Sequence, residues 1–65
     1  MQQGKNKFSV RDNVSGEFVT SYGPNFINMG DEADRIIFES EEDAMSISNA
    51  LDQFDDTLPE IIKES

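Results

Sequence analysis

An amphipathic helix is predicted by the stretch Phe38-Glu-Ser-Glu-Glu-Asp-Ala-Met-Ser-Ile-Ser-Asn-Ala-Leu-Asp-Gln-Phe54. Ser40 is a good N-cap, because its hydroxyl can accept a hydrogen bond from the amide of Asp43. Three carboxylates follow in the first turn, where the helix dipole stabilises negative charge. Apolar residues then recur at spacings of three, four and three, which makes one stripe of Ala44, Ile47, Leu51 and Phe54. We therefore expect a helix over 41–54 that covers the rest of the fold.

A β-hairpin is predicted ahead of the helix. Lys7–Asp12 and Glu17–Tyr22 read as two strands, and Asn13-Val-Ser-Gly16 between them has the composition of a turn. We expect a four-residue loop, with the aromatic side chains of both strands in the core on the face toward the helix.

Two further segments separate the hairpin from the helix. Residues 26–30 follow a break at Gly23-Pro-Asn25 and are compatible with a short strand or with a loop that closes one end of the core. Arg35–Glu39 is predicted to be a third strand, with Ile37 on the face away from the helix, half-exposed or covered by a partner. Residues 58–63 resemble a capped helical turn.

The sum of these elements is an α+β fold. We expect a three-stranded antiparallel sheet, the hairpin plus the third strand, packed by one amphipathic helix in the order β-β-β-α. The other sheet face, with Ser9, Val19 and Ile37, is expected to be wet or a contact surface. The single domain is expected over 7–63, between a disordered tail at 1–6 and a short tail at 64–65.

Composition limits how such a chain can be stabilised. It has 65 residues and no cysteine or histidine, so neither a disulfide nor a His/Cys zinc site contributes. A domain of this size buries only about 60% of the surface that its unfolded chain exposes. The polar N-terminus does not resemble a signal peptide and no segment is apolar enough to span a membrane, so we expect a cytoplasmic protein.

The charge is strongly negative and unevenly distributed. The whole chain carries a net charge of −9; residues 1–30 contribute +1 and residues 31–65 contribute −10. Direct binding to nucleic acid or to anionic lipid requires the opposite sign, so the expected partners are basic surfaces. A net charge magnitude of about 2–8 is enough for the solubility of a small domain, and the net charge of residues 31–65 exceeds that magnitude.

Catalysis and metal binding are not expected. Nucleophilic triads need an imidazole or an equivalent base, and a chain this short can hardly enclose a substrate cavity of about 300 Å³. Asp31-Glu-Ala-Asp34 and the acids at 52–56 do not match the spacing of a calcium-binding EF-hand loop, although weak divalent binding stays open. No cofactor is predicted.

The acidic side chains are the candidate partner-binding site. The set is Asp31, Glu32, Asp34, Glu39, Glu41, Glu42, Asp43, Asp52, Asp55 and Asp56. A helix rises about 1.5 Å per residue, so the acids at its two ends would lie about 15–20 Å apart. Phosphates repeat about every 3.4 Å along one strand of B-DNA, so two such clusters could occupy phosphate sites of a basic groove. The simpler interpretation is that the acids only solubilise a small domain.

A resemblance rests on two stretches, Ser9-Val-Arg-Asp-Asn-Val-Ser-Gly-Glu-Phe-Val19 and Ala33-Asp-Arg-Ile-Ile-Phe-Glu-Ser-Glu-Glu-Asp-Ala44. They resemble small, uncharacterised acidic proteins of bacteriophages and prophages, over about residues 7–54. Phages also encode small acidic inhibitors of host defence nucleases, including anti-CRISPR and anti-restriction proteins similar to DNA in charge. The resemblance implies such an inhibitor and supplies no motif residue for it.

Three hypotheses follow. The first is a non-enzymatic inhibitor whose acids engage the basic surface of a nucleic-acid-binding protein, for example a nuclease or its complex. The second is a homodimeric scaffold or adaptor that pairs through an edge strand, or through Val19, Ile37 and Ile61-Ile62. The third is a calcium-responsive protein, which would melt at a higher temperature with millimolar calcium.

Overall fold

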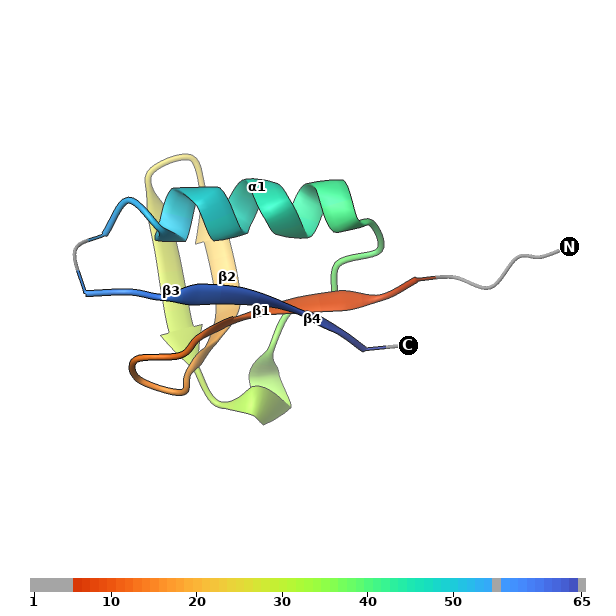
Figure 1. Cartoon of the computed structure of the whole chain (residues 1–65), viewed down its shortest axis with the longest axis horizontal. Coiled ribbons are helices and arrows are strands. Elements are labelled where there is room, and N and C mark those ends of the chain that lie inside the picture. The colour runs from red at the N-terminus through yellow and green to blue at the C-terminus, as the bar shows by residue number, and fades with distance from the viewer. Residues whose placement is uncertain (1–5, 55, 65) are drawn as a thin grey trace, which may run out of the picture.

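Four antiparallel strands and one α-helix form the fold in the computed structural model, which describes residues 6–54 and 56–64 (Figure 1). The elements are β1 (Phe8–Asp12), β2 (Phe18–Gly23), β3 (Phe26–Gly30), the short 3-10 helix η1 (Glu32–Asp34), α1 (Glu41–Leu51) and β4 (Pro59–Lys63). The order across the sheet is β3-β2-β1-β4. The expected α+β class is confirmed, while the number of strands and their order along the chain differ from the prediction.

The N-terminus of α1 is capped as predicted. Ser40 has extended backbone angles, and its Oγ accepts a hydrogen bond from the amide of Asp43 at 3.1 Å. The helix ends at Leu51, three residues earlier than predicted. Ala44 and Leu51 are fully buried, whereas Phe54 lies beyond the helix and is 51% exposed. The apolar stripe therefore packs on the sheet only as far as Leu51.

The predicted hairpin turn is confirmed. The amide of Asp12 donates to the carbonyl of Glu17 at 2.8 Å, which closes a loop of residues 13–16. The amide of Gly16 donates to the carbonyl of Asp12 at 2.7 Å, and Gly16 has a φ of +79°. Glycine suits this position because side chains are disfavoured in left-handed backbone.

The predicted third strand at 35–39 is wrong. β1 and β2 pair only at Arg11 and Phe18 before they separate, and this segment lies between them. The amide of Ile36 donates to the carbonyl of Val19 at 3.0 Å, and Phe38 exchanges two hydrogen bonds with Phe8. Each neighbouring strand forms backbone hydrogen bonds with only part of residues 35–39. The segment therefore forms an isolated β-bridge and no continuous strand.

The third and fourth strands lie elsewhere. β3 occupies 26–30, the segment that was compatible with strand or loop, and pairs with β2. The helical turn predicted over 58–63 is wrong, because β4 lies there. β4 pairs with β1 along its whole length, with Phe8 opposite Lys63 at one end and Asp12 opposite Pro59 at the other. The β-branched Ile61 and Ile62 suit a pleated strand, and proline is tolerated at the first position of an edge strand.

A register shift in β2 corrects the predicted faces. Val19 pairs with Met29 and Ser21 pairs with Asn28, so Thr20 lies in a bulge that resets the alternation. Val19 lies before the bulge, and because Phe18 pairs with Arg11 it faces the core with Phe8 and Val10; its assignment to the wet face was wrong. Tyr22, three positions on, stacks on Phe38 at 5.9 Å between ring centroids.

The face opposite the helix is covered by long polar side chains. Phe18 pairs with Arg11 there and is buried, with the guanidinium carbon 5.9 Å from the ring centroid. Its predicted place in the core on the helix side is therefore wrong. Ser9 is also fully buried, so this face is not generally wet. Ile37 is 37% exposed, in agreement with the half-exposed alternative.

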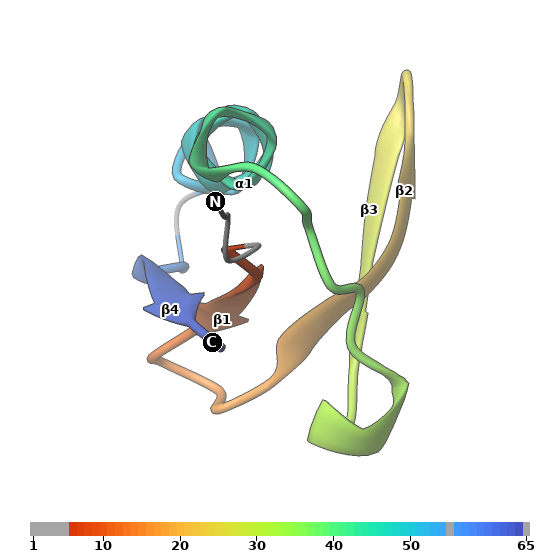
Figure 2. The same ribbon diagram turned by 90° about the vertical axis from the view of Figure 1, so that its right-hand side faces the viewer.

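The sheet is bent, and α1 lies inside the bend. Figure 2 shows β1 and β4 below the helix, the β2–β3 ribbon rising beside it, and η1 at the opposite end of the molecule from α1. The core between them is formed by Phe8, Val10, Val19, Phe38, Ala44 and Leu51. Partly buried Ile27, Met29, Ile36, Ile47 and Ile61 pack around this cluster. The helix is thereby held rigidly on the sheet.

Candidate functional site

The predicted acidic residues fall on two separate parts of the structure. Glu41, Glu42 and Asp43 form the first turn of α1, and Asp52 and Asp56 follow its last turn. Asp31, Glu32 and Asp34 belong to η1 and its N-cap. Glu39 lies on the approach to α1, and Asp55 is outside the described residues. All nine described side chains of the set are exposed.

These two groups are not brought together. In Figures 1 and 2, α1 lies above β1 and β4, and η1 lies at the bottom of the molecule, away from the helix. The structure therefore offers two acidic surfaces. One, the α1 acidic surface, consists of Glu41, Glu42, Asp43, Asp52 and Asp56; the other consists of Asp31, Glu32 and Asp34.

The α1 acidic surface is held by the packing of the helix. Ala44 and Leu51 are buried against the sheet, while Glu42, Ser46 and Asn49 are exposed on the helix. Asp52 lies eleven positions after Glu41, which at a rise of about 1.5 Å per residue sets the two acidic ends about 16 Å apart. The spacing from Glu41 to Asp52 is thus imposed by the helix, whereas Asp56 lies in the turn beyond it.

The acids after α1 oppose the helix dipole, and the chain compensates with a hydroxyl group. No basic residue lies in the last turn. The Oγ1 of Thr57 donates to the carbonyl of Leu51 at 2.6 Å, and it also lies 3.0 Å from the carbonyl of Phe54. The carbonyl of Leu51, which also accepts from the amide of Phe54 at 3.0 Å, thereby gains a second donor at the end of the helix. The sequence analysis did not identify this role of Thr57.

Two arginines of the described residues form ion pairs with other acids. Arg11 pairs with Glu60 at 3.1 Å and Arg35 with Glu64 at 2.8 Å. Neither carboxylate belongs to the predicted set. Within residues 6–54 and 56–64 the predicted acids form no salt bridge. Their charge therefore stays available to an outside partner.

The Arg35–Glu64 pair organises a polar cluster on the sheet face opposite α1. Arg35 donates from Nε and NH2 to the two oxygens of Glu64, at 2.9 and 2.8 Å, and Ser9 Oγ donates to Oε2 at 2.5 Å. The hydrogen bond from Arg35, and then that from Ser9, lowers the pKa of Glu64 to about 2. The same contact raises the pKa of Arg35. The sequence analysis assigned Glu64 to a tail. The two residues are 29 positions apart in the sequence, so no local pattern indicated their ion pair.

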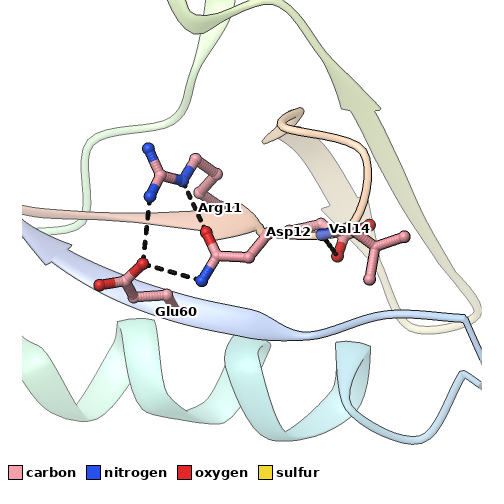
Figure 3. Close-up of polar contacts among 5 residues, drawn as sticks. Arg11, Asp12, Val14 and Glu60 are labelled. Atoms are coloured by element: carbon pink, nitrogen blue, oxygen red, sulfur yellow. Dashed lines mark hydrogen bonds and ion pairs between the residues drawn. The ribbon is translucent and has the colours of Figure 1, made fainter.

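A second cluster fastens the hairpin turn to β4 (Figure 3). Asp12 is 5% exposed; its Oδ1 accepts from the amides of Leu58 at 2.9 Å and Val14 at 3.0 Å. The hydrogen bond from Leu58 is the main cause of a lowered pKa of Asp12. Beside it Glu60 Oε1 accepts from Arg11 and Asn13, and these bonds, that from Asn13 first, lower the pKa of Glu60. These hydrogen bonds join the hairpin turn to the start of β4, so we interpret the cluster as structural.

A groove of about 230 Å³ lies between the β2–β3 turn and the end of α1. Its walls include Pro24, Phe26, Ala50, Gln53 and Phe54, and its lining holds no titratable side chain. It therefore contains no acid, base or nucleophile for a reaction. Across the described residues no three acidic side chains converge to hold a metal ion. In that same part of the chain, no helix is long and apolar enough to cross a membrane.

Comparisons with known proteins found no match: no family model, no curated protein and no solved structure is similar to the chain. The resemblance to small phage proteins consequently stays a prediction. Any function must be argued from the surfaces described above.

Proposed function

We propose that the chain is a non-catalytic binding protein whose α1 acidic surface engages a basic, nucleic-acid-binding surface of another protein. An inhibitor of a phage type, directed against a defence nuclease, is the function that this proposal favours. The observation that carries it is the set of exposed carboxylates on a helix packed into the core, unpaired among the described residues.

Charge and geometry both support the proposal. Two acidic ends about 16 Å apart span the distance of about five phosphates along one DNA strand. A rigid presentation lowers the cost of ordering side chains on binding. Charge complementarity would speed association and would make the affinity fall steeply as salt rises.

The first experiment asks whether nucleic acid and the chain compete. The chain is immobilised, proteins retained from a bacterial lysate are recovered, and elution with a short DNA duplex is compared with elution by an uncharged polymer. We expect the duplex to release a retained protein that itself binds DNA. A retained protein that holds the duplex and the chain simultaneously would contradict charge mimicry.

Matched variants locate the surface. The triple variant Glu42→Gln, Asp52→Asn, Asp56→Asn removes three charges around α1. The control Asp31→Asn, Glu32→Gln, Asp34→Asn removes three charges at η1. We expect the first variant to weaken the recovered complex about tenfold or more, and the control to weaken it several-fold less, because a contacting charge contributes more than a distant screened one. Equal losses in the two variants would show that only net charge matters.

A further inference from the structure

The β2–β3 ribbon differs from the rest of the chain in its charge. Residues 18–30 contain no Asp, Glu, Lys or Arg, although 19 of the 65 residues in the chain are charged. The ribbon rises along one side of the fold, and Phe26 at its turn is 49% exposed (Figure 2). A polar, acidic chain thus presents one uncharged ribbon to its surroundings.

The two edges of the sheet are also unlike each other. β4 begins with Pro59 and carries Glu60 and Lys63, and prolines and charges are the usual means of preventing strand addition. β3, at the opposite edge, reads Phe-Ile-Asn-Met-Gly over 26–30, with no proline and no charge. Among the described strands β3 pairs only with β2, so its outer backbone edge has no strand partner. An unprotected edge of this kind is a template for another strand.

The sequence of β3 is complementary to itself in an antiparallel pair. A two-fold axis at Asn28 sets Ile27 opposite Met29 of the second copy, and Phe26 opposite Gly30 of the second copy. Ile27 and Met29 are half-buried neighbours of the core, so their pairing would extend an apolar face. An aromatic side chain opposite a glycine is a favourable cross-strand pair, and the chain already uses it where Phe26 pairs with Gly23.

We propose that β3 is the interface of a homodimer, in which two copies pair antiparallel about Asn28 to form one eight-stranded sheet. The occupant is a second copy because the register sets the apolar Ile27 opposite the apolar Met29, and because no like charges meet across residues 26–30. The proposed interface shares no residue with the α1 acidic surface, although Phe26 lines the groove beside the end of α1. Val19, considered for a dimer contact from the sequence, is buried in the core and is excluded.

One matched pair of variants tests the interface. Asn28 is exposed, and its Nδ2 donates a hydrogen bond to Ser21 Oγ at 2.9 Å. In Asn28→Asp the hydroxyl group of Ser21 can donate to the new carboxylate instead, so the fold is retained. The variant sets two carboxylates opposite each other, and we expect the dimer dissociation constant to rise by about tenfold or more in sedimentation equilibrium. Asn49→Asp makes the same charge change on the exposed side of α1 and should leave the dimer dissociation constant unchanged. Equal effects of both variants would overturn the interface.

Cysteine cross-linking tests the register directly. The chain has no cysteine, so Asn28→Cys introduces a single thiol. Directly opposite residues have Cβ atoms about 4.5–5.5 Å apart, near the reach of a disulfide. We expect Asn28→Cys to form a covalent dimer under mild oxidation much faster than Asn49→Cys. Equal rates, or a wild-type chain that stays monomeric at high micromolar concentration, would overturn the proposal.

Salt separates this proposal from the proposed function. Two copies that each carry −9 repel one another, so screening should tighten the homodimer as salt rises. The complex with a basic target should weaken over the same range. A homodimer that dissociates as salt rises would contradict pairing through an uncharged edge. That result would not affect the elution experiment with the DNA duplex, which tests the proposed function separately.

Discussion

Arg35 and Glu64 meet as a two-bond ion pair, with Nε to Oε2 at 2.9 Å and NH2 to Oε1 at 2.8 Å. The pair joins the segment that leads into α1 to the residue that follows β4. Ser9 of β1 donates to the same carboxylate. The carboxylate of Glu64 therefore joins three distant parts of the chain, so its protonation at low pH should destabilise the fold.

Glu64 should contribute to stability above its ordinary pKa of 4.5 and lose that contribution as the pH falls toward about 2. The sign follows because the folded state lowers the pKa, so the unfolded state binds the proton more readily. Denaturation in urea between pH 6 and 2 should show a smaller pH dependence for Glu64→Gln than for the wild type. Glu39→Gln, an exposed acid without an ion pair among the described residues, is the control and should follow the wild type more closely.

Removal of the N-cap should destabilise the fold. Ser40 Oγ accepts from the amide of Asp43, and loss of such a cap costs about 1 kcal/mol. We expect Ser40→Ala to lower the free energy of unfolding by that amount in urea denaturation followed by circular dichroism. Ser46→Ala, on the exposed side of α1, should be neutral or slightly stabilising. Equal losses in the two variants would contradict the capping role.

The core should depend on Leu51, which is 1% exposed. Leu51→Ala should cost about 2–5 kcal/mol, a large part of the stability of a domain this small. Leu58→Ala removes the same atoms from a side chain that is 61% exposed and should cost about 0.5 kcal/mol or less. Thermal melting of both variants checks the prediction; similar melting temperatures would place Leu51 outside the core.

Gly23 and Phe26 should be coupled. A Cβ atom at Gly23 would lie 2.3 Å from Cε1 of the Phe26 ring, so Gly23→Ala must displace that ring. We expect Gly23→Ala to destabilise the wild type by about 1 kcal/mol and to become neutral or stabilising in Phe26→Ala, where the ring is absent. A double-mutant cycle measures the difference. Additive free energies would show that the ring moves aside without cost.

Local patterns were sufficient for elements whose partners are close in sequence. Ser40, three positions before Asp43, correctly predicted the start of α1, and Asn13–Gly16 correctly predicted the hairpin loop. Glu41, Glu42 and Asp43 lie in the first turn of α1 and Asp52 at its C-cap, as expected. Their separation from the acids of η1 was not predicted, because it depends on the path of the chain around the sheet.

Long-range pairing decided the other elements. Arg35–Glu39 has the composition of a strand, but β1 and β2 diverge around it and satisfy only part of its backbone. Residues 59–63 form a strand because β1 offers them an open edge, which no local preference could reveal. The pairing of Phe18 with Arg11 reversed the predicted faces of Phe18 and Val19, and the bulge at Thr20 returned Tyr22 to the face of Val19. Composition and local sequence patterns thus established a small acidic α+β chain with one capped helix, since these depend on neighbouring residues. The tertiary structure decided strand order, buried faces and the grouping of charges, because backbone hydrogen bonds between distant segments control all three.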